Sequence, residues 1–307
     1  MITTVTLNVA VDRQPAADAL MPDNAAKVTR YNGSAGGNGI NVSRVANIIG
    51  EKALAIGFAD GNTGNSIEKR LCRKGIEHDL VYVFPESRPG AHESGHSGGK
   101  ITEDHRLMVR QEDFEQLSQK LLANMGKTDI VVLSGGAPEG CSSFVYNELI
   151  RLVKESGKKV ILDANGDWLA EGIKAMPTMI KMNTDEVGEL TGAPVNDRRA
   201  LMEAARMLHN QGIDYVVVSL GRAGALVACD RGVFEGTPPE VEVINTEGCE
   251  DSMVAAFAVG FARGYTIEQS LQYALAVSSA AAMTDETDFL KISDLFQIMD
   301  SAVVRKL

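Results

Sequence analysis

The stretch Asn245–Phe257, which reads NTEGCEDSMVAAF, decides how the rest of the chain is interpreted. It leads into a helix that we predict over Asp251–Arg263, with small side chains on one face at Ala255, Ala256 and Gly260. Amides that begin a helix lie at the positive end of its dipole and form a natural anion site. Asp251 at this point is either a helix cap, worth about 1 kcal/mol, or a carboxylate that accepts a hydroxyl proton beside a bound phosphate.

Short apolar segments precede this stretch at regular intervals. They predict buried strands at Ile2–Asn8, Ala53–Ala59, Asp129–Ser134, Val160–Asp163, Thr178–Met182 and Tyr215–Ser219. The amphipathic segments among them predict helices, which include Ser66–Lys74, Phe114–Met125, Phe144–Glu155 and Arg198–Gln211. Alternation of helices with strands that are apolar on both faces is typical of a mainly parallel sheet covered by helices.

The last third of the chain departs from this alternation. Ala225–Ala228 and Val233–Gly236 predict a hairpin. Three helices are then expected in succession, the one after Asp251 and two more at Ile267–Met283 and Ser293–Ala302.

Two polar segments interrupt the pattern at about residues 12–32 and 84–110, and we predict that they form a small lid beside the sheet. The second contains HESGH at His92–His96, which formally matches a zinc-protease motif. That motif needs a helix to bring both histidines to one face, and the surrounding glycines and Pro89 favour a polar loop instead. No Pro/Ser-rich linker divides the chain, so we expect one domain over residues 1–307.

Composition excludes several classes of protein. The chain has 307 residues, of which 44% are hydrophobic and 23% charged, as in ordinary globular proteins. Lys and Arg number 30 against 41 Asp and Glu, and 30 − 41 gives a net charge of −11 with no basic run. We therefore expect no nucleic-acid partner, because phosphate contacts need clustered Lys and Arg.

The same reasoning bears on location. The longest apolar stretch near the C-terminus, Met253–Ala262, is far shorter than the roughly 20 residues of a membrane helix, so no membrane partner is expected. No basic residue precedes the first apolar segment, so we predict no secretory signal. The cysteines form no CxxC pair, which favours reduced thiols and a cytoplasmic protein; they are Cys72, Cys141, Cys229 and Cys249.

Several glycine-rich turns carry candidate ligand sites. The run at Gly33–Gly39 is not G-x-G-x-x-G and follows no apolar strand, and no phosphate-binding P-loop is present. Ala35–Val45 is equally consistent with a tight helix entry and with a ligand site at its glycines and asparagines. Val218–Leu226 is equally consistent with a plain hairpin and with a ligand site at its glycine turn. Asn183–Glu186 places carboxylates just after a strand end, where open α/β sheets bind ligands.

Taken together and in this order, these motifs resemble the phosphofructokinase-B family of the ribokinase-like superfamily. TLNVAVDR (Thr6–Arg13) is similar to the T-L-N-P-A-x-D opening of its sugar-phosphate kinase branch, and GGNGINVSR (Gly36–Arg44) to its G-G-K-G-I-N-V-S-R. Asn245–Phe257 is similar to its N-T-x-G-A-G-D-S-M-V-A-x-F signature. The motifs between them follow in the family's order at Leu133–Gly140, Leu162–Gly166, Lys181–Glu186 and Val216–Leu226.

The resemblance implies a three-layer α/β/α sandwich with a small β-lid that can form a homodimer contact. It implies an ATP- and Mg²⁺-dependent kinase that phosphorylates a sugar or sugar phosphate, as 1-phosphofructokinase and tagatose-6-phosphate kinase do. By the same resemblance Asp251 is the catalytic base and Gly248, Cys249 and Glu250 form the anion hole. Nucleotide contacts fall on Asn183, Glu186, Ser219, Gly221 and Gly224, with Glu186 also helping to place Mg²⁺. Substrate contacts fall on Asp12, Gly36, Gly37, Asn38, Asn41 and Arg88.

The chain also departs from the family's pattern. Glu250 stands where the anion hole has Gly, and we expect its side chain to block the backbone conformation and its charge to repel phosphate. Asn38 replaces a Lys, which leaves Arg88 as the clear cation for a substrate phosphate. These changes predict an activity weakened by Glu250. The alternative is a catalytically impaired member that binds a sugar phosphate or nucleotide in a regulatory role.

Overall fold

The computed structural model describes residues 1–15, 31–61, 64–83, 107–138, 140–192, 197–284 and 290–307, with the backbone alone for 10–15 and 31–35. The strands are β1 (Ile2–Pro15), β2 (Tyr31–Gly36), β3 (Ala53–Asp60), β4 (Glu77–Val83), β5 (Ile130–Ser134), β6 (Lys159–Asp163), β7 (Met179–Asn183), β8 (Tyr215–Ser219), β9 (Ala225–Cys229), β10 (Gly232–Thr237) and β11 (Val303–Lys306). The helices are α1 (Asn38–Ile48), α2 (Gly64–Arg73), α3 (Gln111–Asn124), α4 (Val145–Glu155), α5 (Gly166–Ile173), α6 (Thr184–Thr191), α7 (Arg198–His209), α8 (Cys249–Ala262), α9 (Ile267–Ala282) and α10 (Ile292–Ile298). Short 3-10 helices span Met125–Lys127 and Gly221–Ala223.

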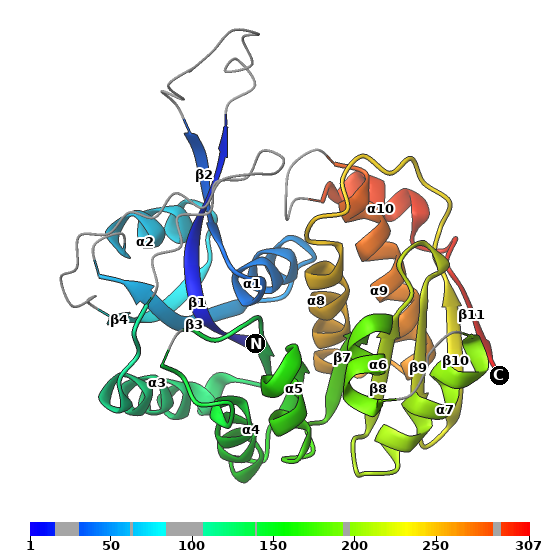
Figure 1. The fold of residues 1–307 in the computed structure, drawn as a ribbon. Helices are drawn as coiled ribbons and strands as arrows, with labels where there is room; N and C mark the ends of the chain where they lie inside the picture. Colours follow the sequence, from blue (N-terminus) through cyan, green and yellow to red (C-terminus); the bar gives the residue numbers. More distant parts are fainter. Residues whose placement is uncertain (16–30, 62–63, 84–106, 139, 193–196, 285–289) are drawn as a thin grey trace, which may run out of the picture.

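One large sheet runs through the molecule (Figure 1). Its strand order is β11-β10-β9-β8-β7-β6-β5-β1-β3-β4. Neighbours from β8 to β4 pair in parallel, whereas β8 to β11 pair antiparallel, as do β1 and β2. Because β1 lies between β3 and β5, the chain winds in both directions from β1, and the carboxyl edge beside it is where such sheets bind ligands.

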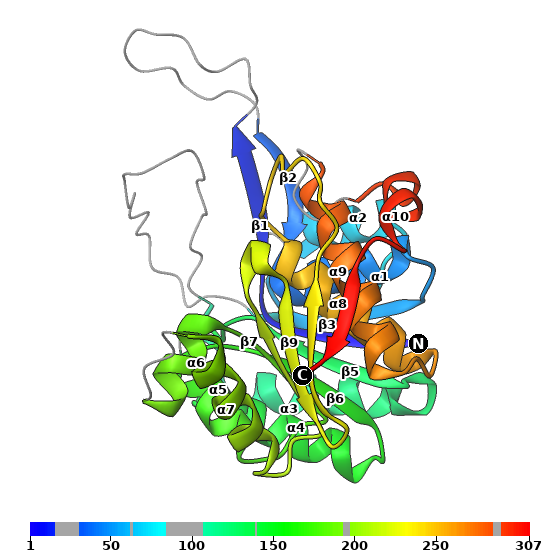
Figure 2. The same ribbon diagram turned by 90° about the vertical axis from the view of Figure 1, so that its right-hand side faces the viewer.

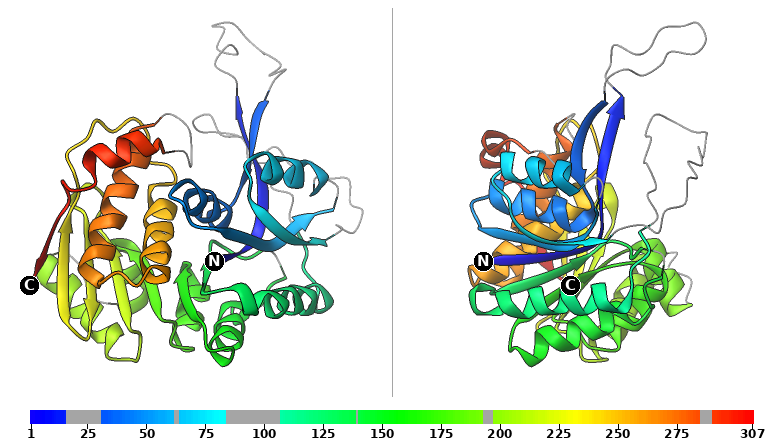
Figure 3. Two further views of the ribbon diagram at one scale, coloured as in Figure 1. Left: turned by 180° about the vertical axis from the view of Figure 1, so that it is seen from behind. Right: turned by 90° about the vertical axis from the view of Figure 1, so that its left-hand side faces the viewer.

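Helices cover both faces of the sheet (Figure 2, and the right panel of Figure 3). Helices α1, α8 and α9 pack on one face around a core that includes Val45, Val254 and Leu275. Helices α3, α4, α5, α6 and α7 pack on the other, around Leu121, Ile150 and the buried ends of the parallel strands. The three-layer α/β/α sandwich predicted from the sequence is confirmed.

Strand β1 has two parts. Its first residues pair with β3 and β5 inside the sheet, and its register on β3 shifts between Thr6 and Val9. Beyond the shift the strand leaves the body and pairs with β2, with Ala10 opposite Gly36 and Pro15 opposite Tyr31 (Figure 1). The sequence predicted only Ile2–Asn8 as a strand, because the second part lacks the apolar run that marks a buried strand.

The start of α1 is locked onto β1. A Cβ atom at Gly37 would lie 2.8 Å from Thr6 Cγ2, and one at Gly39 would lie 2.4 Å from Thr6 Oγ1. Gly37 also has φ of +116°, which side chains rarely adopt. Strand β2 contains the first part of this glycine run, Gly33–Gly36, and is polar, so no apolar strand precedes the run.

The ends of the predicted segments differ most from the structure. Helix α10 ends at Ile298, earlier than predicted, and Val303–Lys306 adds the edge strand β11 beside β10. Two β-branched residues at the start of β11 explain why this segment extends rather than continuing the helix. The second lid segment was expected to reach residue 110, yet Leu107 and Val109 are buried in the core.

No helix among the described residues is long and apolar enough to cross a membrane. All four cysteines are free thiols, as the absence of paired spacing predicted.

Gly57 in β3 offers a direct test of how closely β1 and β3 approach. A Cβ atom there would lie 2.1 Å from the backbone oxygen of Thr6, beside the register shift that frees the second half of β1. We expect Gly57→Ala to lower the free energy of unfolding by about 1–3 kcal/mol, because the two backbones must separate. Urea denaturation would measure the loss.

Gly126 provides the matched control. A Cβ atom there meets nothing within 4 Å, so Gly126→Ala is expected to leave stability nearly unchanged. Equal losses in the two variants would contradict the close approach of β1 and β3.

Candidate active site

Four parallel strands end in polar residues at one edge of the sheet. Register pairs Ser134 at the end of β5 with Asp163 at the end of β6, and Asn183 at the end of β7 with Ser219 at the end of β8. Strands that are otherwise apolar thus deliver a row of hydroxyl, carboxylate and amide groups to the carboxyl edge. Lys181, two residues before Asn183, adds a cation to this row.

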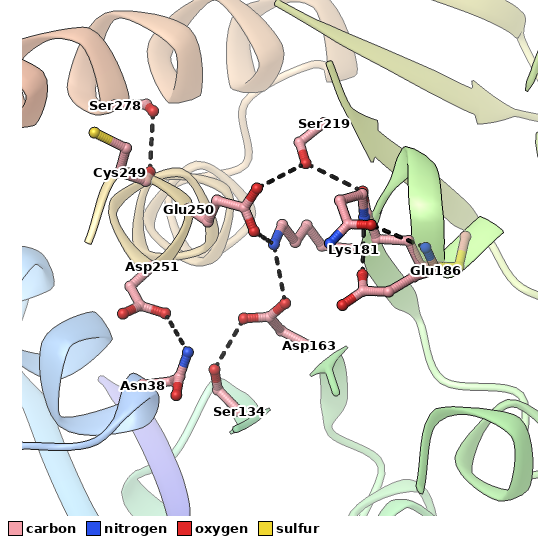
Figure 4. Close-up of polar contacts among 12 residues, drawn as sticks. Asn38, Ser134, Asp163, Lys181, Glu186, Ser219, Cys249, Glu250, Asp251 and Ser278 are labelled. Carbon is pink, nitrogen blue, oxygen red and sulfur yellow. Dashed lines mark hydrogen bonds and ion pairs between the residues drawn. The ribbon is translucent and has the colours of Figure 1, made fainter. Parts of the chain in front are cut away.

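Helix α8 begins across from this row. Gly248 caps it in the left-handed conformation, with φ of +77°, and its carbonyl accepts hydrogen bonds from the amide and hydroxyl of Ser252. Ser278 of α9 donates to the carbonyl of Cys249 at 2.9 Å, which fixes the first turn from the other side (Figure 4). The first amides of a helix have no partner within it, so this turn offers donors to an anion.

Asp251 lies in that first turn, and its carboxylate is held by two amides from α1. Asn38 Nδ2 donates to Oδ1 at 3.1 Å and Asn41 Nδ2 donates to Oδ2 at 2.8 Å (Figure 4 shows the Asn38 contact). Asn41 is 8% exposed, and its own oxygen finds no donor among the described residues.

Burial changes the acidity of Asp251. Loss of hydration in its buried position and the nearby charge of Asp163 raise its pKa to about 7, although the two amides and Lys181 act in the opposite direction. A carboxylate with a pKa near the working pH is well suited to accept a proton and release it again.

A chain of polar contacts links α8 to the strand ends (Figure 4). Ser134 Oγ donates to Asp163 at 3.0 Å, and Asp163 forms an ion pair with Lys181 at 3.3 Å. Lys181 also forms an ion pair with Glu250, which accepts a hydrogen bond from Ser219 Oγ at 3.2 Å. The side chain of Lys181 is 3% exposed; burial lowers its pKa, but Asp163 and Glu250 outweigh that effect and raise it overall.

The expectation that a side chain at Glu250 blocks the backbone conformation is wrong. Glu250 lies inside α8, and Gly248 is the residue that takes the left-handed conformation. Its carboxylate is directed toward Lys181 and Ser219, so its negative charge is partly offset by a buried ammonium group that it shares with Asp163. The predicted repulsion of phosphate ignored this cation.

Asn183 and Glu186 lie together at the start of α6. The side chain of Asn183 accepts from the amide of Glu186 at 2.9 Å, and Glu186 Oε2 accepts from the amide of Asn183 at 2.8 Å. This capping box stabilises the helix end and leaves the second carboxylate oxygen of Glu186 outside it. Burial raises the pKa of Glu186.

The glycines of the predicted sites lie at turns. Gly221 has φ of +57° and open space around its Cβ position, whereas a Cβ atom at Gly224 would lie 1.9 Å from the carbonyl oxygen of Gly236. The segment Val218–Leu226 is therefore a strand, a short 3-10 helix and an antiparallel strand. Gly36 ends β2 and Gly37 caps α1, next to Asn38.

Two predicted substrate residues cannot be compared with this geometry. Arg88 lies outside the described residues, as does the His92–His96 stretch, and of Asp12 only the backbone is described, paired with Ser34. No group of three or more metal-ligating side chains occurs in the part of the chain that the structure describes.

Sequence reasoning missed Ser134, Asp163 and Lys181 as members of the site. Their signal was present, because each polar or ionisable residue ends or nearly ends an apolar run that predicts a buried strand. Single runs did not reveal that the three strand ends are adjacent.

The buried pair of Lys181 and Asp163 predicts a large effect on stability. We expect Lys181→Met to lower the free energy of unfolding by about 3–5 kcal/mol, because Asp163 then stays buried without its cation. Adding Asp163→Asn should restore much of the loss. Lys174→Met is the control. Lys174 also forms an ion pair, with Glu171, but its side chain is largely exposed, so we expect this pair to contribute under about 1 kcal/mol. Similar losses from both lysine variants would contradict the burial of the Lys181 pair.

Known proteins share this fold and these motifs. The model of the pfkB carbohydrate kinase family matches residues 5–291. Tagatose-6-phosphate kinase of Staphylococcus epidermidis is 32% identical over 97% of this chain and 98% of its own length. The 1-phosphofructokinase of Borreliella burgdorferi is 29% identical over 92% of each chain.

A solved structure agrees with these relatives. Phosphofructokinase-2 from Escherichia coli in complex with potassium superposes with a TM-score of 0.85 at 26% identity, over 98% of each chain. Nothing in these comparisons favours the alternative of an impaired, regulatory member or an activity weakened by Glu250. The family match over nearly the whole chain, on an α/β/α fold with a buried carboxylate at the start of α8, means that this protein belongs to the pfkB family of carbohydrate kinases.

Proposed function

We propose that this kinase transfers the γ-phosphoryl group of ATP to a hydroxyl group of a phosphorylated ketohexose. The observation that carries the proposal is Asp251, a buried carboxylate in the first turn of α8 with both oxygens held by amides. It joins a base and an anion site within one helical turn. The named relatives that act on tagatose 6-phosphate and fructose 1-phosphate support this substrate class.

Asp251 acts as the general base. Its raised pKa of about 7 leaves a substantial ionised fraction at neutral pH, and that form accepts the proton of the acceptor hydroxyl as the phosphoryl group arrives. The buried oxygen of Asn41, which has no donor among the described residues, accepts a second substrate hydroxyl. We assign further sugar contacts to Gly36, Gly37, Asn38 and Asp12, and the substrate phosphate to Arg88.

The anion site stabilises the transferring phosphoryl group. Amides at Gly248, Cys249 and Glu250 begin α8, where the helix dipole favours negative charge. Lys181 supplies a buried positive charge that balances Glu250 beside this turn. Phosphoryl transfer depends mostly on such positioning and charge stabilisation.

The nucleotide is assigned to the ends of β7 and β8, at Asn183, Ser219, Gly221 and Gly224. Mg²⁺ usually binds one or two carboxylates together with phosphate oxygens and water, and the free oxygen of Glu186 suits that donor set. When bound with ATP, Mg²⁺ neutralises part of the phosphate charge. The chain itself contributes the α8 amides and the base.

We further propose a homodimer through the arm formed by Ala10–Pro15 of β1 and Tyr31–Gly36 of β2, two segments that pair with each other and with no other strand among the described residues. Free thiols are consistent with a cytoplasmic location.

A substrate panel tests the proposed activity. We expect ATP consumption in the presence of Mg²⁺ with at least one of fructose 1-phosphate, fructose 6-phosphate and tagatose 6-phosphate, and less with unphosphorylated fructose and tagatose. A coupled assay for ADP would measure the rates. Turnover with free sugars alone would contradict the phosphorylated substrate, and no turnover with any sugar or sugar phosphate would contradict the proposed reaction.

Replacing the base gives a second prediction. Asp251→Asn should lower kcat at least ~100-fold with little change in the KM for ATP, because the proton acceptor is lost. Asp185→Asn, which removes an exposed first-turn carboxylate of α6, is the matched control and should retain full activity. Unchanged turnover after Asp251→Asn would remove this residue from the mechanism.

The same variant has a second readout in stability. The folded state holds the proton of Asp251 more tightly than the unfolded chain, so this group lowers stability as pH rises from about 4 to about 7. The ionised form costs up to about 4 kcal/mol above that range. Asp251→Asn should therefore be more stable than the parent at pH 8, and the difference should shrink below pH 5.

A further inference from the structure

The carboxylate of Asp251 is gripped by two side chains of a different helix. Asn38 and Asn41 are three residues apart, so both project from the same face of the first turn of α1. Each donates one amide hydrogen to a different oxygen of Asp251, at 3.1 Å and 2.8 Å. A carboxylate held at both oxygens cannot rotate about its terminal bond, which fixes the direction of its remaining lone pairs.

The two asparagines differ in their surroundings. Asn41 is buried, and its side-chain oxygen has no donor among the described residues. Asn38 is exposed, and among the described residues it lies beside Asp251 and Gly135. A Cβ atom at Gly135 would lie 3.1 Å from Asn38 Oδ1, so only glycine leaves full space for this amide. Gly135 takes φ of +99°, and its carbonyl accepts from Tyr146 Oη at 2.7 Å, which fixes that loop.

The backbone that carries Asn38 is equally constrained. The absence of side chains at Gly37 and Gly39 lets the first turn of α1 approach Thr6 of β1 closely. The amide of Asn38 thus lies between a fixed loop and the carboxylate, on a helix start that packs directly against the sheet. In this arrangement the side chain of Asn38 can fix the position of the Asp251 carboxylate.

The charges around Asp251 explain why a neutral donor matters. The described charged groups near it are Asp163 on β6, Lys181 on β7 and its neighbour Glu250 on α8. The thiol of Cys249 in the same turn is also titratable, and burial raises its pKa to about 11, so it is neutral in the range where Asp251 titrates. Lys181 is already paired with Asp163 and Glu250, and only the two amides donate side-chain hydrogen bonds to Asp251 among the described residues. The family pattern quoted above has Lys at position 38, which would add a cation within reach of the carboxylate.

We propose that Asn38 is a positioning residue of this kinase: its neutral amide holds Asp251 toward the acceptor hydroxyl and leaves the carboxylate a stronger base than a lysine at this position would. This inference rests on the proposed role of Asp251 as the base. It assigns to Asn38 an action through Asp251, in addition to any contact with the substrate.

A charge series at position 38 tests the inference. The acidic limb of kcat/KM against pH reports the base in the free enzyme. We expect Asn38→Lys to move that limb down by about 1 pH unit or more, and Asn38→Asp to move it up by a similar amount. Asn38→Leu, which removes the donor without adding charge, should lower kcat about tenfold or more while the KM for ATP stays constant.

Two controls separate local from general effects. Asn210→Lys adds the same charge at an exposed position at the end of α7, and the limb should stay in place. Thermal unfolding of each variant establishes that it is folded. Asn38 is exposed, so its substitutions are expected to be tolerated.

A carbon-13 NMR titration measures the effect of residue 38 on the pKa of Asp251 directly, without an activity assay. The signal of the Asp251 carboxyl carbon is identified by its loss in Asp251→Asn. The midpoint should rise in the order Asn38→Lys, parent, Asn38→Asp. If both the kinetic limb and this midpoint stay in place across the series, the inference is overturned and the kinase assignment stands. If Asp251→Asn keeps full turnover, the assignment of the base fails instead, whatever the NMR midpoints show.

Discussion

The buried carboxylate of Asp251 is the constraint on which the rest of the site depends. A carboxylate without water is costly unless hydrogen bonds and charges compensate for the lost hydration. In this chain the compensation comes from two amides of α1 and from the dipole at the start of α8. Helices that lie far apart in the sequence must therefore meet at one point, and the small side chains of α8 allow this close packing.

Charged side chains at the ends of the strands form the second part of the site. Lys181 is almost fully buried and is flanked by the carboxylates of Asp163 and Glu250, so the cation and the anions require one another. Removing Lys181 leaves the carboxylate of Asp163 buried without a cation. Glu250 is accommodated by this arrangement: its charge, which would otherwise face an incoming phosphate alone, is paired with an ammonium group. The network also ties the first turn of α8 to the ends of β7 and β8, where the nucleotide is proposed to bind.

Much of the fold could be predicted from patterns that are local in the sequence. The parallel strands are apolar on both faces and the helices between them have apolar stripes, which predicted a mainly parallel sheet covered by helices. The family resemblance added the three-layer arrangement. Errors occurred where neighbouring elements decide the conformation. The second half of β1 and the edge strand β11 lack the signature of buried strands and are extended because β2 and β10 pair with them. Leu107 and Val109 were assigned to the lid because the polar residues before them obscured two buried side chains.

For the site, the sequence by itself determined the chemical groups and their order along the chain: Asp251 at a helix start, the glycines before Asn38, and Asn183 and Glu186 after a strand. Only the tertiary structure decided which groups meet. Asn38 and Asn41 bind Asp251 from 213 and 210 positions away in the sequence. Lys181 and Glu250, which form an ion pair, are 69 positions apart. The physical reason is that capping, helix periodicity and strand burial are encoded by near neighbours, whereas the pairing of charges depends on the register of adjacent strands and the packing of helices across the sheet.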